Sequence, residues 1–240
     1  GKGRMEEPEK IVEVLESFFN QQQDLRGKKV LITAGPTYEK IDPVRFIGNY
    51  SSGKMGYALA EECASRGADV ILVSGPVTLK EHNPNIRRID VESAEEMYEE
   101  ARRAYTDADA GILCAAVADF TPDHTADHKI KRGKDGMTIQ LKPTKDIAAS
   151  LGATKKEGQV LVGFALETND EQQNAKGKLE RKNFDFIVLN SLNDKGAGFR
   201  VDTNKISIID RQDTTSYPLK NKSEVAKDII DRLVQTLNKN

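Results

Sequence analysis

The segment "GNYSSGKMG" at residues 48–56 combines the glycines, hydroxyl groups and positive charge of an anion-binding turn. Gly48, Gly53 and Lys54 match part of the P-loop pattern, but Met55 stands where that pattern needs a Ser or Thr to bind Mg²⁺. Glycines let backbone N–H groups approach a ligand, and the helix expected after this turn presents its positive end. We therefore predict an anion site other than a P-loop. Its polar groups would be Asn49, Ser51, Ser52 and Gly53.

A second candidate site is the loop "DHTADHKIKRGKDG" at residues 123–136, which follows an apolar run that ends near Asp119. Its positive side chains are Lys129, Lys131, Arg132 and Lys134. A charge run of this kind is usually a solvated surface loop. The functional alternative is a group of cations that covers a polyphosphate, and Asp119 is then either a structural cap or a candidate ligand for Mg²⁺.

A third candidate is the helical segment after "VGFALE". Lys178 and Lys182 are four residues apart and therefore share one helix face. This spacing is also typical of a solvated stripe. Phe164 is either a core residue at the end of a strand or an apolar wall beside a base.

Short apolar runs alternate with helical segments along most of the chain, which predicts an α/β fold: a doubly wound, mostly parallel Rossmann-like sheet with helices on both faces. In such sheets ligands bind beyond the carboxyl ends of the strands. The predicted strands are 30–34, 70–74, 111–118, 160–167, 184–191 and a late edge strand at 205–210. The predicted helices are 8–19, 55–64, 93–104 with Ser93 as cap, and 223–239 with Ser223 as cap.

Composition excludes several classes of protein. The chain has 240 residues and a formal net charge of −2, so no global positive field favours nucleic acid. No run approaches the roughly 20 apolar residues of a membrane span. The two cysteines, Cys63 and Cys114, cannot form a disulfide framework, so we expect a cytoplasmic protein.

Four stretches together resemble the phosphopantothenoylcysteine synthetase family: "ITAGPTYEKIDPVRFIGNYSSGKMG", "AAVADF" followed by "HKIKR", "VGFALET" and "RKNFDFIVLNS". The resemblance implies a phosphopantothenate–cysteine ligase of coenzyme A biosynthesis. Such an enzyme joins 4′-phosphopantothenate to L-cysteine with CTP and Mg²⁺. An acyl cytidylate forms first, and pyrophosphate and CMP are released. The family also implies a homodimer.

The resemblance assigns roles to individual residues. Asn49 and Lys129 match catalytic positions, and Ser51, Ser52 and Gly53 match the phosphopantothenate turn. The positions that match contacts to CTP are Asp119, Lys129, Lys145, Asp146, Ile147, Ala148, Phe164, Lys178 and Lys182. The text "KPTKDI" departs from the family's usual "KNPDI"-like text, so Lys145 matches less well than Asp146 and Ile147.

The resemblance also predicts the domain organisation. Residues 1–27 would be an N-terminal helix and linker, a remnant of an upstream flavin-dependent decarboxylase domain, and residues 28–240 the ligase domain. No flavin is expected in this fragment.

Two other functions use the same kind of sheet. An NAD(P)-dependent oxidoreductase would need a Gly-x-Gly-x-x-Gly turn after the first strand, where only Gly35 stands, and an acidic residue after the second strand, where Ser74 stands. A non-catalytic nucleotide-binding module would not need Asn49 or Lys129.

Overall fold

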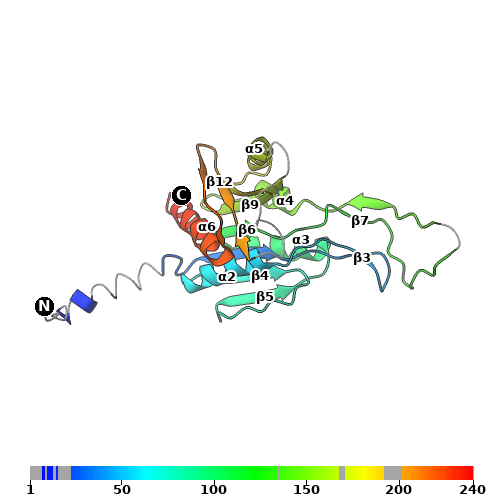
Figure 1. Cartoon of the computed structure of the whole chain (residues 1–240), viewed down its shortest axis with the longest axis horizontal. Helices are drawn as coiled ribbons and strands as arrows, with labels where there is room; N and C mark the ends of the chain where they lie inside the picture. Colours follow the sequence, from blue (N-terminus) through cyan, green and yellow to red (C-terminus); the bar gives the residue numbers. More distant parts are fainter. Residues whose placement is uncertain are drawn as a thin grey trace.

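The centre of the molecule is an eight-stranded sheet in the order β13-β12-β10-β9-β6-β1-β4-β5 (Figure 1). The structure is a computed structural model, and it describes residues 23–133, 136–167, 171–191 and 202–239 with a few residues between 7 and 15. The predicted helix at 8–19 lies largely outside the described residues, as do parts of the 1–27 segment.

Six neighbouring strands of the sheet are parallel, and two more are added antiparallel at one edge. The parallel strands are β1 (Lys29–Ala34), β4 (Asp69–Ser74), β5 (Ile86–Asp90), β6 (Ala110–Leu113), β9 (Val160–Glu167) and β10 (Phe186–Ser191). The antiparallel strands are β12 (Ile206–Ile209) and β13 (Thr214–Ser216). The predicted doubly wound α/β fold is therefore confirmed.

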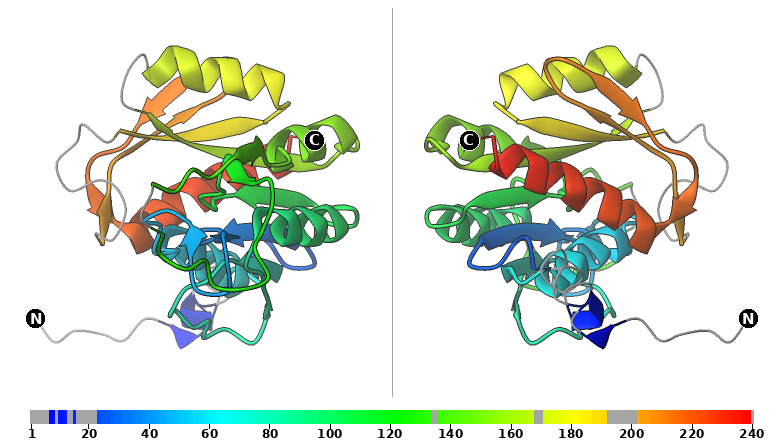
Figure 2. Two further views of the ribbon diagram at one scale, coloured as in Figure 1. Left: turned by 90° about the vertical axis from the view of Figure 1, so that its right-hand side faces the viewer. Right: turned by 90° about the vertical axis from the view of Figure 1, so that its left-hand side faces the viewer.

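Helices cover both faces of this sheet (Figure 2). One face carries α2 (Lys54–Ser65) and α6 (Lys222–Leu237). The other face carries α3 (Ala94–Tyr105), α4 (Ile147–Thr154) and α5 (Glu171–Arg181). The chain turns from one side of β1 to the other between β5 and β6, so the carboxyl ends of β1 and β6 mark the switch point at which such folds bind ligands.

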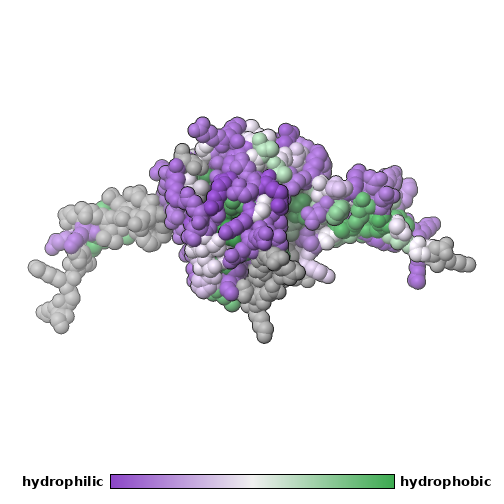
Figure 3. All heavy atoms as spheres, turned by 90° about the horizontal axis from the view of Figure 1, so that it is seen from above, coloured by the Kyte–Doolittle hydropathy of each residue, from purple (hydrophilic) through white to green (hydrophobic). Residues whose placement is uncertain are grey.

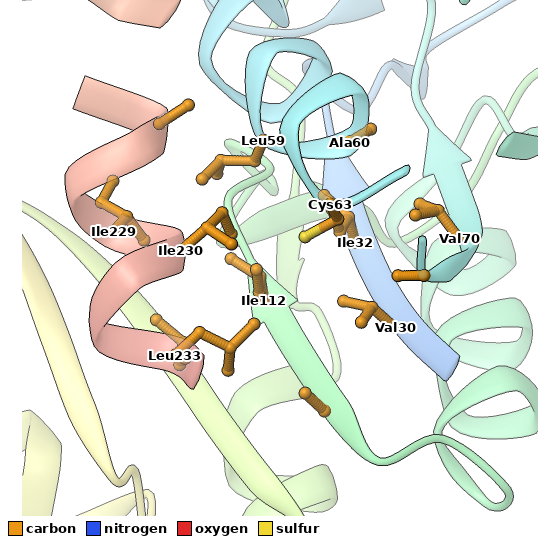
Figure 4. Close-up of a cluster of buried hydrophobic side chains, with 14 of the residues drawn as sticks. Val30, Ile32, Leu59, Ala60, Cys63, Val70, Ile112, Ile229, Ile230 and Leu233 are labelled. Atoms are coloured by element: carbon orange, nitrogen blue, oxygen red, sulfur yellow. The ribbon is translucent and has the colours of Figure 1, made fainter. Parts of the chain in front are cut away.

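Alternation along β1 explains how the two faces are filled. Val30 and Ile32 pack with Leu59 and Ile230 of the α2–α6 layer, whereas Leu31 packs against the α3–α5 layer (Figure 4). Because successive side chains of a strand point to opposite faces, a strand that is buried on both faces is apolar at every position. The run "VLITA" has this pattern and predicts the central strand.

Local residue types mark the ends of the helices, although one of the predicted caps is wrong. The Ser93 hydroxyl accepts a hydrogen bond from the Glu96 backbone N–H at 3.2 Å, which confirms the predicted cap of α3. Gly67 has a φ of 89° after α2. The prediction of Ser223 as the cap of α6 is wrong, because Asn221 is the N-cap and forms a capping box with Glu224.

Four short strands form an arm that projects from the sheet, at the right of Figure 1. Here β2 (Glu39–Lys40) pairs with β3 (Phe46–Ile47), and β7 (Phe120–Pro122) pairs with β8 (Leu141–Pro143). The strands β2 and β7 lie against each other. We call the described part of residues 38–47 and 120–143 the arm. A further small pair, β11 (Thr203–Asn204) and β14 (Lys220–Asn221), precedes α6.

Within the described ranges, no helix has the length and apolar character that crossing a membrane requires.

Candidate functional site

The first pocket opens at the carboxyl ends of β6, β9 and β10, on the face that carries α2 and α6. We call it the serine pocket, a cavity of about 150 Å³. Its rim is the turn that begins α2, and its apolar wall includes Met55 and Phe164. The lining residues are Ser51–Gly56, Cys114–Ala116, Phe164–Leu166, Asn190, Asn204 and Lys222. The turn predicted to bind an anion therefore does line a cavity.

Two amides at the floor of the serine pocket lack a hydrogen-bond donor. The Oδ1 atoms of Asn190 and Asn204 are buried without a partner in the protein, and Asn204 is only 1% exposed. Because a buried, unsatisfied acceptor is costly, such atoms indicate a place for a ligand N–H or O–H group or an ordered water.

The charges around this pocket differ in their exposure to water, since Lys222 is buried whereas the Lys54–Asp202 pair is exposed. Lys222 is buried, and burial, followed by the nearby charge of Lys54, lowers the pKa of its ammonium group. The Lys54 Nζ atom lies 2.6 Å from the Asp202 Oδ1 atom. Burial also raises the pKa of the Cys114 thiol to about 12, so this sulfur is neutral near pH 7.

The second pocket lies on the opposite face of the sheet, beside α4 and α5. We call it the lysine pocket, a cavity of about 330 Å³. Its lining includes three lysines and two aspartates, so it can hold a multiply charged anion through direct contacts. These charged residues are Asp119, Lys145, Asp146, Lys178 and Lys182.

Local structure explains how Asp146 and Lys182 are held at the lysine pocket. Asp146 is the N-cap of α4, where its carboxylate accepts a hydrogen bond from the Ala149 backbone N–H at 2.9 Å. Burial by itself would raise the pKa of Asp146, but backbone N–H donors and Lys182, whose Nζ atom lies 3.1 Å away, bring this pKa below its ordinary value. Asp146 is therefore charged at neutral pH and holds Lys182 at the pocket.

Lys145 is held toward the rim of the lysine pocket by neighbouring carboxylates. Its Nζ atom lies 2.6 Å from the Glu95 Oε1 atom and 3.7 Å from the Glu99 Oε1 atom. The hydrogen bond to Glu95 is the main cause of its raised pKa. A ligand in the pocket would compete with these exposed pairs, which are individually weak.

The serine and lysine pockets adjoin each other through Ala115 and Phe164, which line both of them. The structure therefore brings together most of the predicted nucleotide-binding residues in one pocket and Ser51, Ser52 and Gly53 in the next. An elongated ligand can place an anionic group among the lysines and an apolar, hydrogen-bonding part in the serine pocket. Phe164 lines both pockets, is partly exposed and also packs against the core, so both of its predicted roles stay open.

Two predicted residues lie elsewhere. The Asn49 Nδ2 atom donates to the Ala116 carbonyl at 2.7 Å, and its Oδ1 atom accepts from the Ser51 N–H at 3.0 Å. Asn49 thus ties the serine turn to the segment after β6 and lines neither pocket. Lys129 is exposed on the arm and also lines neither pocket.

Sequence reasoning missed the polar floor of the serine pocket. Asn190 lies at the carboxyl end of the predicted strand 184–191, and this place was a usable signal. Asn204 and Lys222 come from the small β11–β14 pair and the first turn of α6. Only the antiparallel return of the chain brings them to the pocket, so local pattern could not reveal them.

Gly53 has a conformation that a side chain would strain. Its φ is 76°, and an added Cβ would lie 3.0 Å from the Val77 Cγ1 atom. Gly27 has a φ of 77° but open space around it. We expect Gly27→Ala to lower the free energy of unfolding by about 1–2 kcal/mol and Gly53→Ala by more than that. Denaturant unfolding of both variants measures this, and an equal loss would contradict the close packing of the serine turn.

No cluster of three or more His, Cys, Asp or Glu side chains suited to a metal ion occurs among the described residues. In that part of the chain Asp119 therefore does not belong to a cluster of three or more such side chains.

Comparison with known proteins shows which family the chain resembles. Residues 25–237 match the DFP family model, described as "DNA/pantothenate metabolism flavoprotein C-terminal domain". The chain is 57% identical over 239 residues to a "Cysteine/Cysteine sulfinic acid decarboxylase" of an unknown prokaryotic organism, and the match covers 98% of this chain and 67% of that protein.

The chain is also similar to proteins that are named bifunctional. The chain is 48% identical over 236 residues to the "Coenzyme A biosynthesis bifunctional protein CoaBC" of Bacillus subtilis (strain 168), covering 97% of this chain but only 58% of that protein. A solved structure of the C-terminal domain of a CoaBC protein superposes with a TM-score of 0.78 at 40% identity, covering 91% of this chain and 100% of that domain. That superposition supports the Rossmann-like fold.

These names contradict the predicted identity, function and enzyme class. The matched family is described as part of a flavoprotein, and the relative at 57% identity is named a decarboxylase. None of the three names above is that of a CTP-dependent ligase. The prediction of a phosphopantothenate–cysteine ligase is therefore corrected to membership of this flavoprotein family, in which the relative at 57% identity is named a decarboxylase.

The cofactor prediction is corrected for the same reason. CTP and Mg²⁺ without flavin were expected, whereas a flavoprotein family implies FMN. The two pockets do not fit the flat tricyclic ring of a flavin. The apolar serine pocket is smaller than the roughly 300–1,000 Å³ that drug-sized ligands fill. The lysine pocket is large enough, but five of its lining residues are charged. No chemical step through the flavin is therefore assigned to these residues.

Proposed function

Because the chain belongs to the DFP family of flavoprotein C-terminal domains, we propose that it binds phosphopantothenoylcysteine as one part of a bifunctional protein of coenzyme A biosynthesis. The adjoining serine and lysine pockets are the observation that carries this proposal. One relative is named a decarboxylase, and we propose that the parent protein decarboxylates this compound. To the residues of this chain we assign only the binding and orientation of the compound.

The chemistry of the ligand matches the two pockets. Phosphopantothenoylcysteine is elongated, with a phosphate at one end, amide groups along its length and a carboxylate and thiol at the other end. Lys178 and Lys182 suit an anionic group, because charge-assisted hydrogen bonds are the stronger ones. The Oδ1 atoms of Asn190 and Asn204 suit an amide N–H, since each is a buried acceptor that lacks a donor. The apolar walls suit the methylene chain between these groups.

Two expectations from the sequence, on the domain organisation and on the binding residues, are part of this proposal. The 28–240 segment would be the functional unit, joined in a longer cytoplasmic chain to a second domain. The substrate-binding residues would be those of the serine turn and the lysine pocket, with the phosphopantothenoyl group in place of a nucleotide.

We also propose that the arm joins two copies of the chain. Hairpins of two or three residues per strand are marginal in isolation. The arm nevertheless exposes Val44 by 62% and Phe120 by 52%, and Figure 3 shows hydrophobic side chains gathered along it. Apolar surface of this kind marks an interface, and a second copy would cover the same surface on both partners.

The dimer would bring distant cations to the pockets. Arg45 and Lys129 lie on the arm, which projects away from the body of its own chain (Figure 1). A two-fold partner could receive them at its own ligand. The predicted role of Lys129 then depends on the second copy.

We expect Val44→Asp with Phe120→Asp to separate the dimer, because two buried charges without partners are costly. Sedimentation of the variant should show a dissociation constant raised about 100-fold or more, equivalent to roughly 2.7 kcal/mol. Leu219→Asp is the matched control, since Leu219 is 48% exposed and lies outside the arm. A double variant that sediments as the wild type does would rule out the arm as the interface.

The experiment that tests the function titrates the chain with phosphopantothenoylcysteine and measures binding. We expect binding without FMN. A parallel reaction contains 4′-phosphopantothenate, L-cysteine and CTP. Pyrophosphate release and a cysteine amide in that reaction would contradict the proposal and return the chemistry to ligation.

A further inference from the structure

Asp42 is a fully buried carboxylate in the β2–β3 turn of the arm. Its side chain has 0% exposure, although the arm around it is open to solvent. Its Oδ1 atom accepts hydrogen bonds from the Val44 and Arg45 backbone N–H groups at 2.8 and 2.9 Å. Its Oδ2 atom accepts from the Ile130 N–H at 3.1 Å and pairs with the Arg45 guanidinium. Both oxygens are thus fully used.

These contacts join two segments that are far apart in the sequence. The Arg45 Nη1 atom also donates to the Ile130 carbonyl at 3.2 Å, so Arg45 and Asp42 hold both polar groups of one peptide residue. The same two segments are further linked by the Ala126 N–H, which donates to the Ile41 carbonyl at 3.0 Å. Hydrogen bonds to the β2–β3 turn therefore hold residues 126–130 in place.

We propose that Asp42 is the positioning residue of the arm's cationic loop, which fixes Lys129 through the backbone of its neighbour Ile130. This inference rests on the proposed function and its dimer, in which Lys129 would reach the anionic groups of the ligand bound by the second copy. Lys129 would make that contact, and Asp42 acts only through Lys129. Nothing in the sequence pattern separates Asp42 from an ordinary turn aspartate.

The electrostatics of Asp42 agree with this role. Burial favours the neutral acid, but the N–H groups of Val44, Ile130 and Arg45 and the charge of Arg45 outweigh burial and lower the pKa of Asp42. The carboxylate is therefore charged at neutral pH and present as an acceptor for all four donors.

The test uses the full chain and compares Asp42→Asn with Asp127→Asn, since Asp127 is an exposed aspartate of the cationic loop itself. Asparagine keeps the size of the side chain but removes its charge and one acceptor. Amide hydrogen exchange should be at least tenfold faster at Ile130 in Asp42→Asn and unchanged in Asp127→Asn. Affinity for phosphopantothenoylcysteine should fall about tenfold or more in Asp42→Asn alone.

A double variant separates positioning from general damage. If Asp42 acts through Lys129, then Asp42→Asn in a Lys129→Gln background should lower affinity by less than about threefold, because the two losses are not additive. Additive losses would overturn the inference, as would unchanged exchange at Ile130. A wild-type chain that does not bind the compound would refute the proposed function, and the exchange result would still decide whether Asp42 anchors the loop.

Discussion

Binding of phosphopantothenoylcysteine is expected to weaken about 100-fold or more when Lys178 and Lys182 are both replaced by Gln. Lys178 lines the lysine pocket from the last turn of α5, and Lys182 lines it from the residue after this helix. A lost hydrogen bond to a charged group typically costs about 1.5–3 kcal/mol. Two such losses correspond to a factor of 100 or more at 25 °C. Calorimetric titration of the wild type and the variant measures the ratio directly.

The matched control replaces Lys176 and Arg181 by Gln. Both residues belong to α5 and are exposed, and neither lines the lysine pocket. The control therefore changes the net charge of the same helix by the same amount. Affinity should stay within about threefold of wild type. If the two double variants lose affinity equally, the effect is a long-range field and not contact with the ligand.

The largest effect on stability is expected from Phe186→Ala. Phe186 is only 1% exposed in β10 and belongs to the core beneath α6. Removal of a buried Phe side chain costs about 3–5 kcal/mol, since packing is lost and a cavity remains. Thermal unfolding should show a Tm lower by roughly 6–20 °C for a domain of this size.

Leu219→Ala provides the comparison for this result, because Leu219 is 48% exposed. Its free energy of unfolding should change by no more than about 0.5 kcal/mol. A Phe186→Ala variant that melts as Leu219→Ala does would show that β10 is not part of the cooperative core.

Local rules account for much of this fold. The continuous apolar run "VLVGFALE" predicts a buried strand at 160–167, and β9 is Val160–Glu167. The pattern "SAEE" predicts the start of α3 with Ser93 as its cap. The repeated strand–helix order then predicts the parallel sheet, and with it the edge at which Ser51 to Gly53 and Lys178 lie.

Long-range pairing accounts for the rest. The arm strands β7 and β8 contain three residues each and expose apolar side chains, so no periodicity marks them. Asn204 reaches the serine pocket only because β12 returns antiparallel to β10. Residue types also indicate an anionic ligand without naming the reaction. The predicted ligase rested on resemblance, and the names of the relatives contradict it.

The most direct test of the central claim is a titration of the chain with phosphopantothenoylcysteine beside pantothenoylcysteine, which lacks the phosphate. The account predicts saturable binding of the phosphorylated compound and affinity at least tenfold weaker without the phosphate, since the lysine pocket contributes charge-assisted contacts. Equal affinity for the two compounds, or no binding of either by the folded chain, would contradict the account.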